Sequence, residues 1–415
     1  MIKRGFLSDL FVGAGVKRLA TVDANPDSSN QHEVTGSKTL LQILGDTERK
    51  KAAHNDERFT ATYIWIGGEQ EAISEEGRLS WYDSRRNKPR SAEWRLYYQG
   101  NSITRLMRPG DFLFVARRRD DHLLFIIAPA ESTIQNQLVW LFGIDEESDS
   151  KFTVRDITKD QTAELDFAAR YILDELGIEF EEPQADKLFA LLKRFKNTFP
   201  TTKEFSALAR SSLPDVSAKD DADSVLMAWL EQEELLFRAL ERSIVGERLR
   251  GGFVENNIAD VDGFLSFSLS VQNRRKSRAG HSLENHLEVI FVSRGIHFAR
   301  GAETENRNKP DFIFPGQKEY QNHLFSAEKL TMLGAKSTLK DRWRQVLAEA
   351  ERIKSKHLIT LEPRISRNQT DQMKASNLQL VVPKKIQSTY LPSQHSSLMN
   401  LDEFLSLVTT RQTGA

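Results

Sequence analysis

The sequence is 415 residues long, with 28% charged and 39% hydrophobic residues, a composition that suits two or three folded domains and excludes a largely disordered chain. Its 58 Lys and Arg residues balance 59 Asp and Glu residues, so net charge indicates no polyanionic partner, and the absence of cysteine excludes a disulfide framework, a Cys-ligated zinc site and a Cys nucleophile. No apolar run approaches the roughly 18 residues of a membrane span and the first residues lack a secretory signal, so we expect a soluble, intracellular protein.

Residues 1–150 are predicted to form a mainly antiparallel β-barrel or sandwich. Gly, Asn and Asp residues separate short runs of β-branched and aromatic residues, a pattern typical of strands joined by turns. Helical patterns are sparse here, and Ser37–Leu44 is the best candidate. The expected strands are Thr60–Ile66, Glu93–Tyr98, Asp111–Val115 and His122–Ile127.

Residues 151–195 are predicted to be a helical linker. Apolar residues recur at helical spacing over Leu165–Leu176, and Gly177 stands where a glycine commonly ends a helix. The polar surroundings of Pro183 favour a connection between domains.

Residues 196–415 are predicted to form an α/β domain preceded by helices. Thr201–Glu204 fits a capping box, Leu226–Leu240 marks a long helix, and the alternating charges of residues 231–250 indicate a solvated helix face. From residue 246 onward, strands separated by helices favour a mixed sheet flanked by helices. The expected strands are Asp311–Phe314, Leu330–Leu333, His357–Leu361 and Leu378–Val382, and the expected helices are Ser282–Ser293, Leu339–Lys356 and Leu398–Val408.

Four charged residues of this domain fall at the ends of expected strands or on the helices beside them. Asp311 opens one strand and Lys336 ends the next, so adjacent strands would place a carboxylate beside an ammonium at the sheet edge. Glu349 on the following helix, or Glu284 on the preceding one, would add a second carboxylate and complete an oxygen site that suits Mg²⁺. Such a metal can activate water for phosphodiester cleavage, and Lys336 can orient that water or neutralise the phosphate. Taken singly, an Asp after proline is typical of a turn and a strand-end Lys of a solvated side chain.

Two basic stretches lie close to these residues. The first fits either phosphate contact or a solvated basic turn. The second begins the helix after Lys336, where a helix N-terminus can approach DNA, an Arg can pair with guanine and an acid can accept from cytosine. Because a site-specific nuclease couples cutting to base recognition, this proximity favours a nuclease. The stretches are Arg274, Arg275, Lys276 and Arg278, and then Lys340, Asp341 and Arg342.

Several motifs of this domain resemble the catalytic domain of EcoRII-type restriction endonucleases in order and spacing, over roughly residues 195–415. The resemblance implies the PD-(D/E)xK nuclease fold, Mg²⁺ dependence and double-strand cleavage at a short palindrome that leaves 5′-phosphates. If Lys340–Arg342 keep the family's role, the palindrome has CC and GG halves. The motifs are Asn273–Gly280, Ser282–Glu284, Lys309–Phe312, Lys336–Gln345 and Val381–Pro383.

Residue by residue, the resemblance implies that Asp311 and Glu349 bind metal, that Lys336 is the catalytic lysine and that Glu284 is a supporting acid. One position departs from the wider superfamily, because Gly334 stands where many such nucleases carry Asp or Glu. In the EcoRII branch the second acid comes from the next helix, where Glu349 stands here.

The N-terminal half resembles the same family's effector domain more weakly, a DNA-binding pseudobarrel shared with plant transcription factors. The resemblance rests on Ser29–Glu33 and on Arg86–Arg90 followed by Trp94. Two such loops would follow phosphates together, although a polar turn and a charged hairpin also fit. The residues expected to contact DNA are Asn30, Gln31, His32, Arg86, Lys88 and Arg90.

We therefore expect a type II restriction endonuclease of a prokaryotic cytoplasm that acts on double-stranded DNA as a homodimer, with a cognate DNA methyltransferase in the same cell. Two alternatives remain: a repair or nicking nuclease on the same fold, and a DNA-binding regulator whose nuclease domain has decayed. The presence of Asp311, Lys336 and Glu349 argues against decay.

Overall fold

The computed structural model describes residues 5–24, 32–45, 57–67, 72–85, 89–144, 151–158, 165–179, 188, 191–195, 198–255, 258–340 and 342–414. The chain divides into two compact units, one of residues 4–181 with 363–368 and one of residues 182–362 with 369–415. Among the described residues, no helix is both long enough and apolar enough to cross a membrane.

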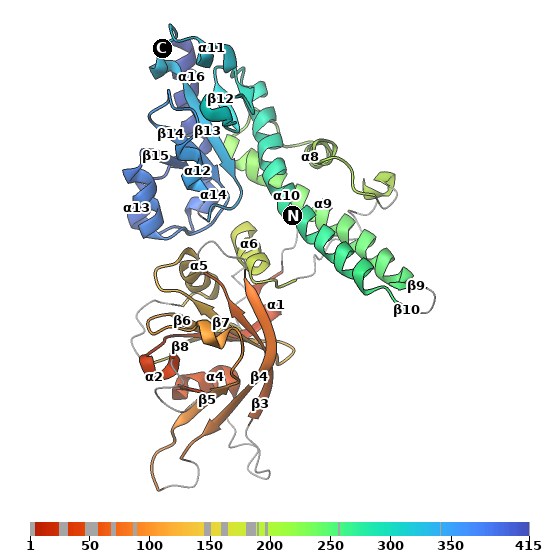
Figure 1. The fold of residues 1–415 in the computed structure, drawn as a ribbon, viewed down its shortest axis with the longest axis vertical. Coiled ribbons are helices and arrows are strands. Elements are labelled where there is room, and N and C mark those ends of the chain that lie inside the picture. Colours follow the sequence, from red (N-terminus) through yellow and green to blue (C-terminus); the bar gives the residue numbers. More distant parts are fainter. Residues whose placement is uncertain are drawn as a thin grey trace. The chain divides into compact units, whose positions relative to one another are not determined.

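The first unit is built on an eight-stranded sheet with the order β2-β5-β4-β3-β7-β6-β1-β8, shown in Figure 1. Its neighbouring strands are antiparallel except for the parallel pair β3 and β7. The four strands expected from the sequence correspond to β3, β5, β6 and β7. The strands are β1 (Phe11–Arg18), β2 (Glu33–Thr35), β3 (Glu57–Trp65), β4 (Ile73–Asp83), β5 (Trp94–Tyr98), β6 (Phe112–Arg118), β7 (Leu123–Ala128) and β8 (Thr153–Asp156). The helices are α1 (Leu7–Leu10), α2 (Thr21–Ala24), η1 (Lys38–Leu40), α4 (Leu41–Leu44), η3 (Thr104–Leu106), α5 (Thr133–Phe142) and α6 (Phe167–Glu175).

Both faces of this sheet are buried. Along β7, Leu124 and Ile126 enter one apolar core while Leu123 and Phe125 enter another, as the alternation of a strand requires. The first core includes Ile172 and its neighbours on α6. The helix that the sequence placed in a linker is therefore part of the first unit, because its apolar face completes that unit's core.

The second unit contains a five-stranded sheet with the order β11-β12-β13-β14-β15. The pairs β11–β12 and β12–β13 are antiparallel, whereas β13–β14 and β14–β15 are parallel, so the sheet is mixed, as expected. The strands are β9 (Val254–Glu255), β10 (Ile258–Ala259), β11 (Ala299–Arg300), β12 (Phe312–Phe314), β13 (Thr331–Lys336), β14 (Lys356–Thr360) and β15 (Leu378–Val381). The helices are η4 (Lys193–Phe195), α8 (Thr202–Ser211), α9 (Ala222–Gly251), α10 (Val261–Ser293), η5 (Glu305–Arg307), α11 (Gln317–Gln321), η6 (Ala327–Lys329), α12 (Trp343–Leu347), α13 (Arg367–Ala375), α14 (Lys384–Gln387), α15 (Pro392–His395) and α16 (Leu401–Thr413).

Two helices differ from the sequence-based expectation. Helix α10 begins at Val261 rather than at Ser282, so the basic stretch, for which a solvated turn was one of two interpretations, is helical. Helix α12 ends at Leu347, and Ala350 has a left-handed backbone with φ of 49°. The apolar spacing predicted the burial of this segment but not that turns would replace the helix.

Candidate active site

Asp311 and Lys336 form an ion pair at one edge of the five-stranded sheet. Asp311 immediately precedes β12, which pairs with β13 so that Phe312 lies opposite Leu333. The Asp311 carboxylate accepts a hydrogen bond from the Ala335 backbone N–H at 2.6 Å and lies 2.9 Å from the Lys336 ammonium. The two side chains meet as the strand pattern predicted.

Glu349 lies in the turn that follows α12, where its backbone N–H donates to the Val346 carbonyl at 3.2 Å. Among the described atoms, its Oε2 is buried and has no hydrogen-bond partner. The pKa of Glu349 is raised to about 7, chiefly by burial; the Lys336 ammonium opposes this rise, the Asp311 carboxylate adds to it, and the Lys356 ammonium also opposes it. Glu349 therefore lies within electrostatic range of both members of the ion pair.

The surroundings of Gly334 leave little room for a side chain. A Cβ atom at Gly334 would lie 3.1 Å from a methyl group of Val346 and 3.2 Å from a methyl group of Leu358. A carboxylate side chain would have to displace α12 from β13 at that point. The carboxylate of Glu349, in the turn after α12, is instead the one that interacts with the Asp311–Lys336 pair.

Asp311 and Glu349 fit a divalent cation. A buried carboxylate oxygen without a hydrogen bond is costly, and a hard cation would satisfy it. Two carboxylates beside one ammonium offer the oxygen ligands that Mg²⁺ prefers while leaving coordination positions for water or phosphate.

Lys356 interacts electrostatically with Glu349, and the sequence analysis did not single it out. Its side chain is buried at the start of β14, and its Nζ donates to the carbonyls of Ile353 at 2.9 Å and Ala350 at 3.3 Å. Burial lowers the pKa of Lys356, which the Glu349 carboxylate opposes. A lysine at the start of an apolar strand could have drawn attention to it, because a buried ammonium group needs hydrogen-bond acceptors.

Glu284 belongs to a neighbouring cluster centred on Arg300. The guanidinium donates to Glu284 at 2.7 Å, to Glu288 at 2.8 Å and to the Asn285 side-chain oxygen at 3.0 Å. Arg300 lies on β11 opposite Phe312, the residue after Asp311. The structure thus places Glu284 near the site through Arg300, with no contact to Asp311 recorded among the described residues.

The segment expected to contact bases connects β13 to α12. Arg342 is exposed and donates to the Thr338 carbonyl at 2.6 Å, while Lys340 has a left-handed backbone and its carbonyl accepts from Gln369 at 2.7 Å. Asp341 lies outside the described residues. The buried carboxylate of Glu362 accepts the backbone N–H of Leu339, so it fixes the start of this segment.

The stretch with Arg274, Arg275, Lys276 and Arg278 lies on α10 and faces acidic residues of α9. Arg278 is buried, pairs with Glu234 and packs over the Phe237 ring, and Arg275 pairs with Glu241. Arg274 and Lys276 are exposed. The acids of α9 were expected on a solvated face, but these contacts use them to hold α9 against α10. Phosphate contact by this stretch stays a prediction.

The N-terminal residues expected to contact DNA are only partly described. Asn30, Gln31, Arg86 and Lys88 lie outside the described residues. The His32 ring packs edge-on against Tyr98, with centroids 5.6 Å apart, and Arg90 is exposed.

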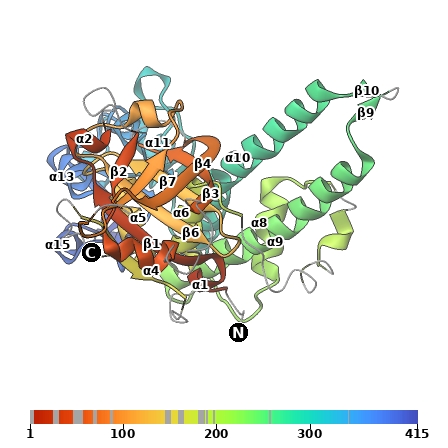
Figure 2. The same ribbon diagram turned by 90° about the horizontal axis from the view of Figure 1, so that it is seen from below.

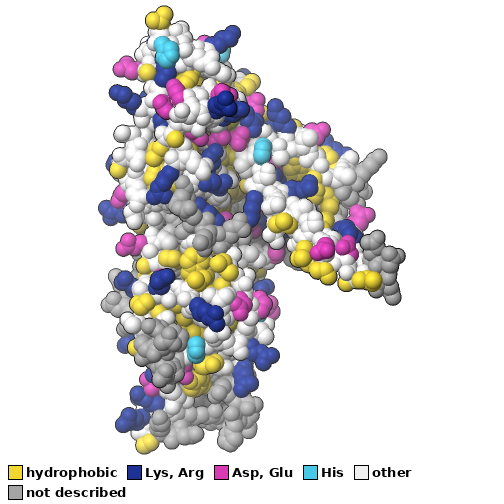
Figure 3. All heavy atoms as spheres, viewed as in Figure 1, with side chains coloured by type: hydrophobic (Ala, Val, Ile, Leu, Met, Phe, Trp, Pro, Cys, Tyr) yellow, Lys and Arg dark blue, Asp and Glu magenta, His cyan; other side chains and the backbone are white. Residues whose placement is uncertain are grey.

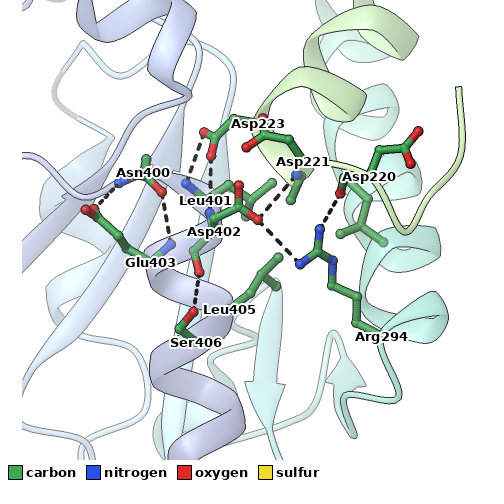
Figure 4. Close-up of polar contacts among 12 residues, drawn as sticks. Asp220, Asp221, Asp223, Arg294, Asn400, Leu401, Asp402, Glu403, Leu405 and Ser406 are labelled. Atoms are coloured by element: carbon green, nitrogen blue, oxygen red, sulfur yellow. Dashed lines mark hydrogen bonds and ion pairs between the residues drawn. The ribbon is translucent and has the colours of Figure 1, made fainter.

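A second group of carboxylates, Asp221, Asp223 and Asp402, has ligand atoms within 4.8 Å of one another. Figure 4 shows these side chains with Arg294. The Lys384 ammonium lies 2.8 Å from Asp221 and 3.3 Å from Asp402, and Asp223 accepts backbone N–H groups at the start of α16. These contacts satisfy the acids and join α9 to α16.

Residues 237–405 match the family model described as EcoRII C terminal. The chain is 37% identical over 234 residues to the type II restriction enzyme EcoRII of Escherichia coli, an alignment that covers 56% of each protein. It is 30% identical over 166 residues to the type II restriction enzyme SsoII of Shigella sonnei, covering 36% of this chain and 53% of that enzyme. The chain thus spans about half the length of these curated relatives. A solved structure of metal-depleted Ecl18kI in complex with uncleaved DNA aligns with a TM-score of 0.44 and 17% identity, over 56% of this chain and 86% of that one.

Residues 237–405 are therefore similar to the EcoRII C-terminal domain. This confirms the resemblance to EcoRII-type restriction endonucleases for that part of the chain.

Proposed function

We propose that this chain, which is similar to the EcoRII C-terminal domain over residues 237–405, is a type II restriction endonuclease that cleaves double-stranded DNA with Mg²⁺ as cofactor. The observation that carries the proposal is the buried, unpartnered Glu349 oxygen, whose carboxylate interacts electrostatically with the Asp311–Lys336 pair. The same geometry disfavours a decayed nuclease, because neutral drift would not preserve an unsatisfied buried carboxylate.

Asp311 and Glu349 would hold the cation with one oxygen each. When bound, Mg²⁺ supplies positive charge at the attacked phosphate and favours ionisation of a bound water. Lys336, held by Asp311 at 2.9 Å, donates a hydrogen bond to a non-bridging phosphate oxygen and offsets the charge that develops there. Attack of hydroxide on phosphorus with loss of the 3′ oxygen leaves a 5′-phosphate.

Recognition is proposed for Lys340, Asp341 and Arg342, which follow Lys336 directly in the chain. Their chemistry suits G·C pairs, so we propose a short palindrome with CC and GG halves. Cutting both strands of a palindrome requires two symmetry-related sites, and hence a homodimer. A cell that contains this activity needs a cognate methyltransferase to protect its own DNA.

The first unit is proposed to be a DNA-binding effector that binds a further copy of the site and restrains cleavage. Its exposed Arg90 and the expected contacts at Asn30, Gln31, His32, Arg86 and Lys88 support this role. A fragment that starts near Asp186 should then cut single-site DNA faster than the full chain does.

Plasmid cleavage tests the central proposal. Wild-type protein with Mg²⁺ should give discrete linear fragments with 5′-phosphate ends, and sequencing of those ends should reveal one palindrome. Asp311→Ala and Glu349→Ala should abolish cleavage but retain DNA binding in Ca²⁺. Glu351→Ala is the matched control, because Glu351 lies two residues from Glu349 but its carboxylate accepts a hydrogen bond from the Asn306 side chain. Binding without cleavage by the wild type would favour the regulator, and nicks without fragments would favour the repair nuclease.

A further inference from the structure

Left-handed backbone conformations gather around the candidate active site. Among the residues that the structure describes, five non-glycine residues of the second unit have a positive φ angle. Such conformations cost free energy and persist only where the surrounding structure enforces them, which is common at functional sites. Four of the five lie within five residues of Asp311, Lys336 or Glu349 in the sequence. The five are Asn306, Arg307, Lys340, Ala350 and Asn377.

Two of these residues are consecutive and lie in the middle of the 304–308 loop, which runs from Thr304 to Asn308. Asn306 has a φ of 58° and Arg307 a φ of 62°. Asparagine tolerates this conformation, whereas for arginine it is unfavourable. The loop is closed at its base, because the Thr304 backbone N–H donates to the Asn308 carbonyl at 2.8 Å. The loop therefore keeps one conformation against the preference of Arg307.

The 304–308 loop contacts the turn that carries Glu349 on both sides of that residue. The Asn308 side-chain amide donates to the Ala348 carbonyl at 2.9 Å, and the Glu305 carboxylate accepts the Glu351 backbone N–H at 3.2 Å. Ala348 directly precedes Glu349, and Glu351 follows it by two residues. Replacing the Glu351 side chain would leave both contacts in place.

Helix α11, which is labelled in Figures 1 and 2, supports the same carboxylate. The hydroxyl of its buried Tyr320 donates a hydrogen bond to Glu305 and accepts the Arg352 backbone N–H at 3.4 Å. On the face of the second unit that Figure 3 shows, acidic and basic side chains are interspersed among the coloured residues. Charge on that face therefore indicates no separate ligand, whereas the hydrogen bonds connect the loop with the Glu349 turn.

A short, stiff connection joins the loop to Asp311. Only Lys309 and Pro310 separate Asn308 from Asp311, and Pro310 is buried. Proline fixes its own φ and disfavours the helical region for the residue before it, so this connection has little freedom. One hydrogen bond and a few residues of restricted backbone therefore link Asp311 to Glu349.

We propose that Asn308 is a positioning residue for the divalent cation, because it fixes the spacing between the Asp311 and Glu349 carboxylates. Groups that orient metal ligands commonly contribute about tenfold to a hundredfold in affinity. The unfavourable conformation of Arg307 is then part of holding Asn308 against the turn. The inference rests on the proposed function, since it deepens the assignment of Asp311 and Glu349 as metal ligands.

Metal binding without DNA is the first test. Mn²⁺ suits the same oxygen ligands as Mg²⁺, and its binding to the full-length protein can be followed by electron paramagnetic resonance. Asn308→Ala removes the donor to the Ala348 carbonyl and should weaken Mn²⁺ binding about tenfold or more. Asn308→Gln keeps an amide donor and should stay close to the wild-type affinity. Wild-type affinity in Asn308→Ala would overturn the inference.

Asn322→Ala is the matched control. The Asn322 side chain also makes a hydrogen bond to the backbone, accepting the Leu324 N–H at 3.0 Å, and this contact lies away from the Glu349 turn in the sequence. The control should bind Mn²⁺ as the wild type does, and thermal unfolding of both alanine variants in EDTA should be similar. An equal loss of Mn²⁺ affinity in the two variants would assign the effect to folding and overturn the inference.

A second pair of variants tests the backbone of the loop. Glycine adopts the φ of Arg307 readily, whereas valine, which is branched at Cβ, does not. Arg307→Gly should therefore keep the Mn²⁺ affinity of the wild type, and Arg307→Val should weaken it. An equal loss in both variants would assign the effect to the arginine charge, and no loss in either would show that the loop conformation does not matter. Both results would overturn the inference.

Hydrogen exchange separates this inference from the proposed function, because it needs neither metal nor DNA. In EDTA, Asn308→Ala should speed exchange of the Glu351 and Arg352 amides, whose acceptors are Glu305 and Tyr320. If the wild type cuts DNA but Asn308→Ala keeps both protected amides and Mn²⁺ affinity, only the inference fails. If the wild type neither binds Mn²⁺ nor cuts DNA, the proposed function fails and the inference fails with it.

Discussion

Replacing Glu349 with glutamine should stabilise the metal-free protein, and the effect should grow with pH. Burial raises the pKa of this carboxyl from 4.5 to about 7. The folded state therefore holds its proton more tightly than the unfolded state, so stability is fully present below pH 4.5 and is lost as pH rises through 7. A shift of this size corresponds to roughly 3 kcal/mol, at about 1.4 kcal/mol for each pH unit.

Glutamine keeps the shape of the side chain but cannot ionise. In EDTA, Glu349→Gln should therefore match the wild type near pH 4.5 and exceed its unfolding free energy by up to about 3 kcal/mol at pH 8. Urea unfolding followed by pulsed hydrogen exchange in peptides of the second unit measures this difference without a signal from the first unit. Mg²⁺ should then stabilise the wild type at pH 8 and have little effect on the variant.

Glu305→Gln is the control with the opposite sign. Burial tends to raise the pKa of Glu305, but hydrogen bonds from the Tyr320 hydroxyl and the Glu351 backbone N–H lower it overall. Its contribution to stability is present above the unfolded pKa and is lost as pH falls, so this variant should be less stable than the wild type at neutral pH. A Glu349→Gln difference that does not vary between pH 4.5 and 8 would refute the electrostatic account of the site.

Three further substitutions test the surroundings of the site. Lys356→Met should lower the free energy of unfolding in urea by about 1–3 kcal/mol, because the carbonyls of Ala350 and Ile353 lose their donor. It should also raise the Mg²⁺ concentration for half-maximal cleavage. An unchanged Mg²⁺ requirement would count against a role of Lys356 in holding the Glu349 turn. Glu362→Ala should reduce cleavage of the cognate site at least tenfold while Ca²⁺-supported binding to random DNA is retained, since the Leu339 N–H loses its acceptor; equal losses on both DNAs would contradict this. Arg342→Ala should reduce discrimination at one G·C pair by about 1–3 kcal/mol in competition binding, and an equal loss of affinity for random duplex would refute base contact.

The strand pattern was sufficient to predict the Asp311–Lys336 pair, because residues at the ends of neighbouring strands must meet. It did not predict the turn at Glu349, since Val346, Ala350 and Ile353 have helical spacing and all three are buried, although only Val346 lies in a helix. In the structure, the Lys356 ammonium donates to the Ala350 and Ile353 carbonyls of these turns.

The charged residues of α9 and α10 illustrate a second limit. An alternation of acidic and basic residues gives the same sequence pattern whether the helix faces water or packs against another helix. Arg278 and Glu234 are 44 residues apart, and Glu233 pairs with the buried His286 at 2.9 Å. Nothing local in the sequence indicates such partners or the complete burial of the His286 side chain.

The order of residues along the β13–α12 connection has a kinetic consequence. Lys336, Arg342 and Glu349 fall within one stretch of fourteen residues, anchored at Leu339 by Glu362 and beyond its end by Lys356. A wrong base pair that displaces Arg342 would therefore also displace the groups on either side of it. In the proposed enzyme, a wrong base pair would then be rejected twice: the near-cognate site would be bound less tightly, and it would also be cut more slowly once bound.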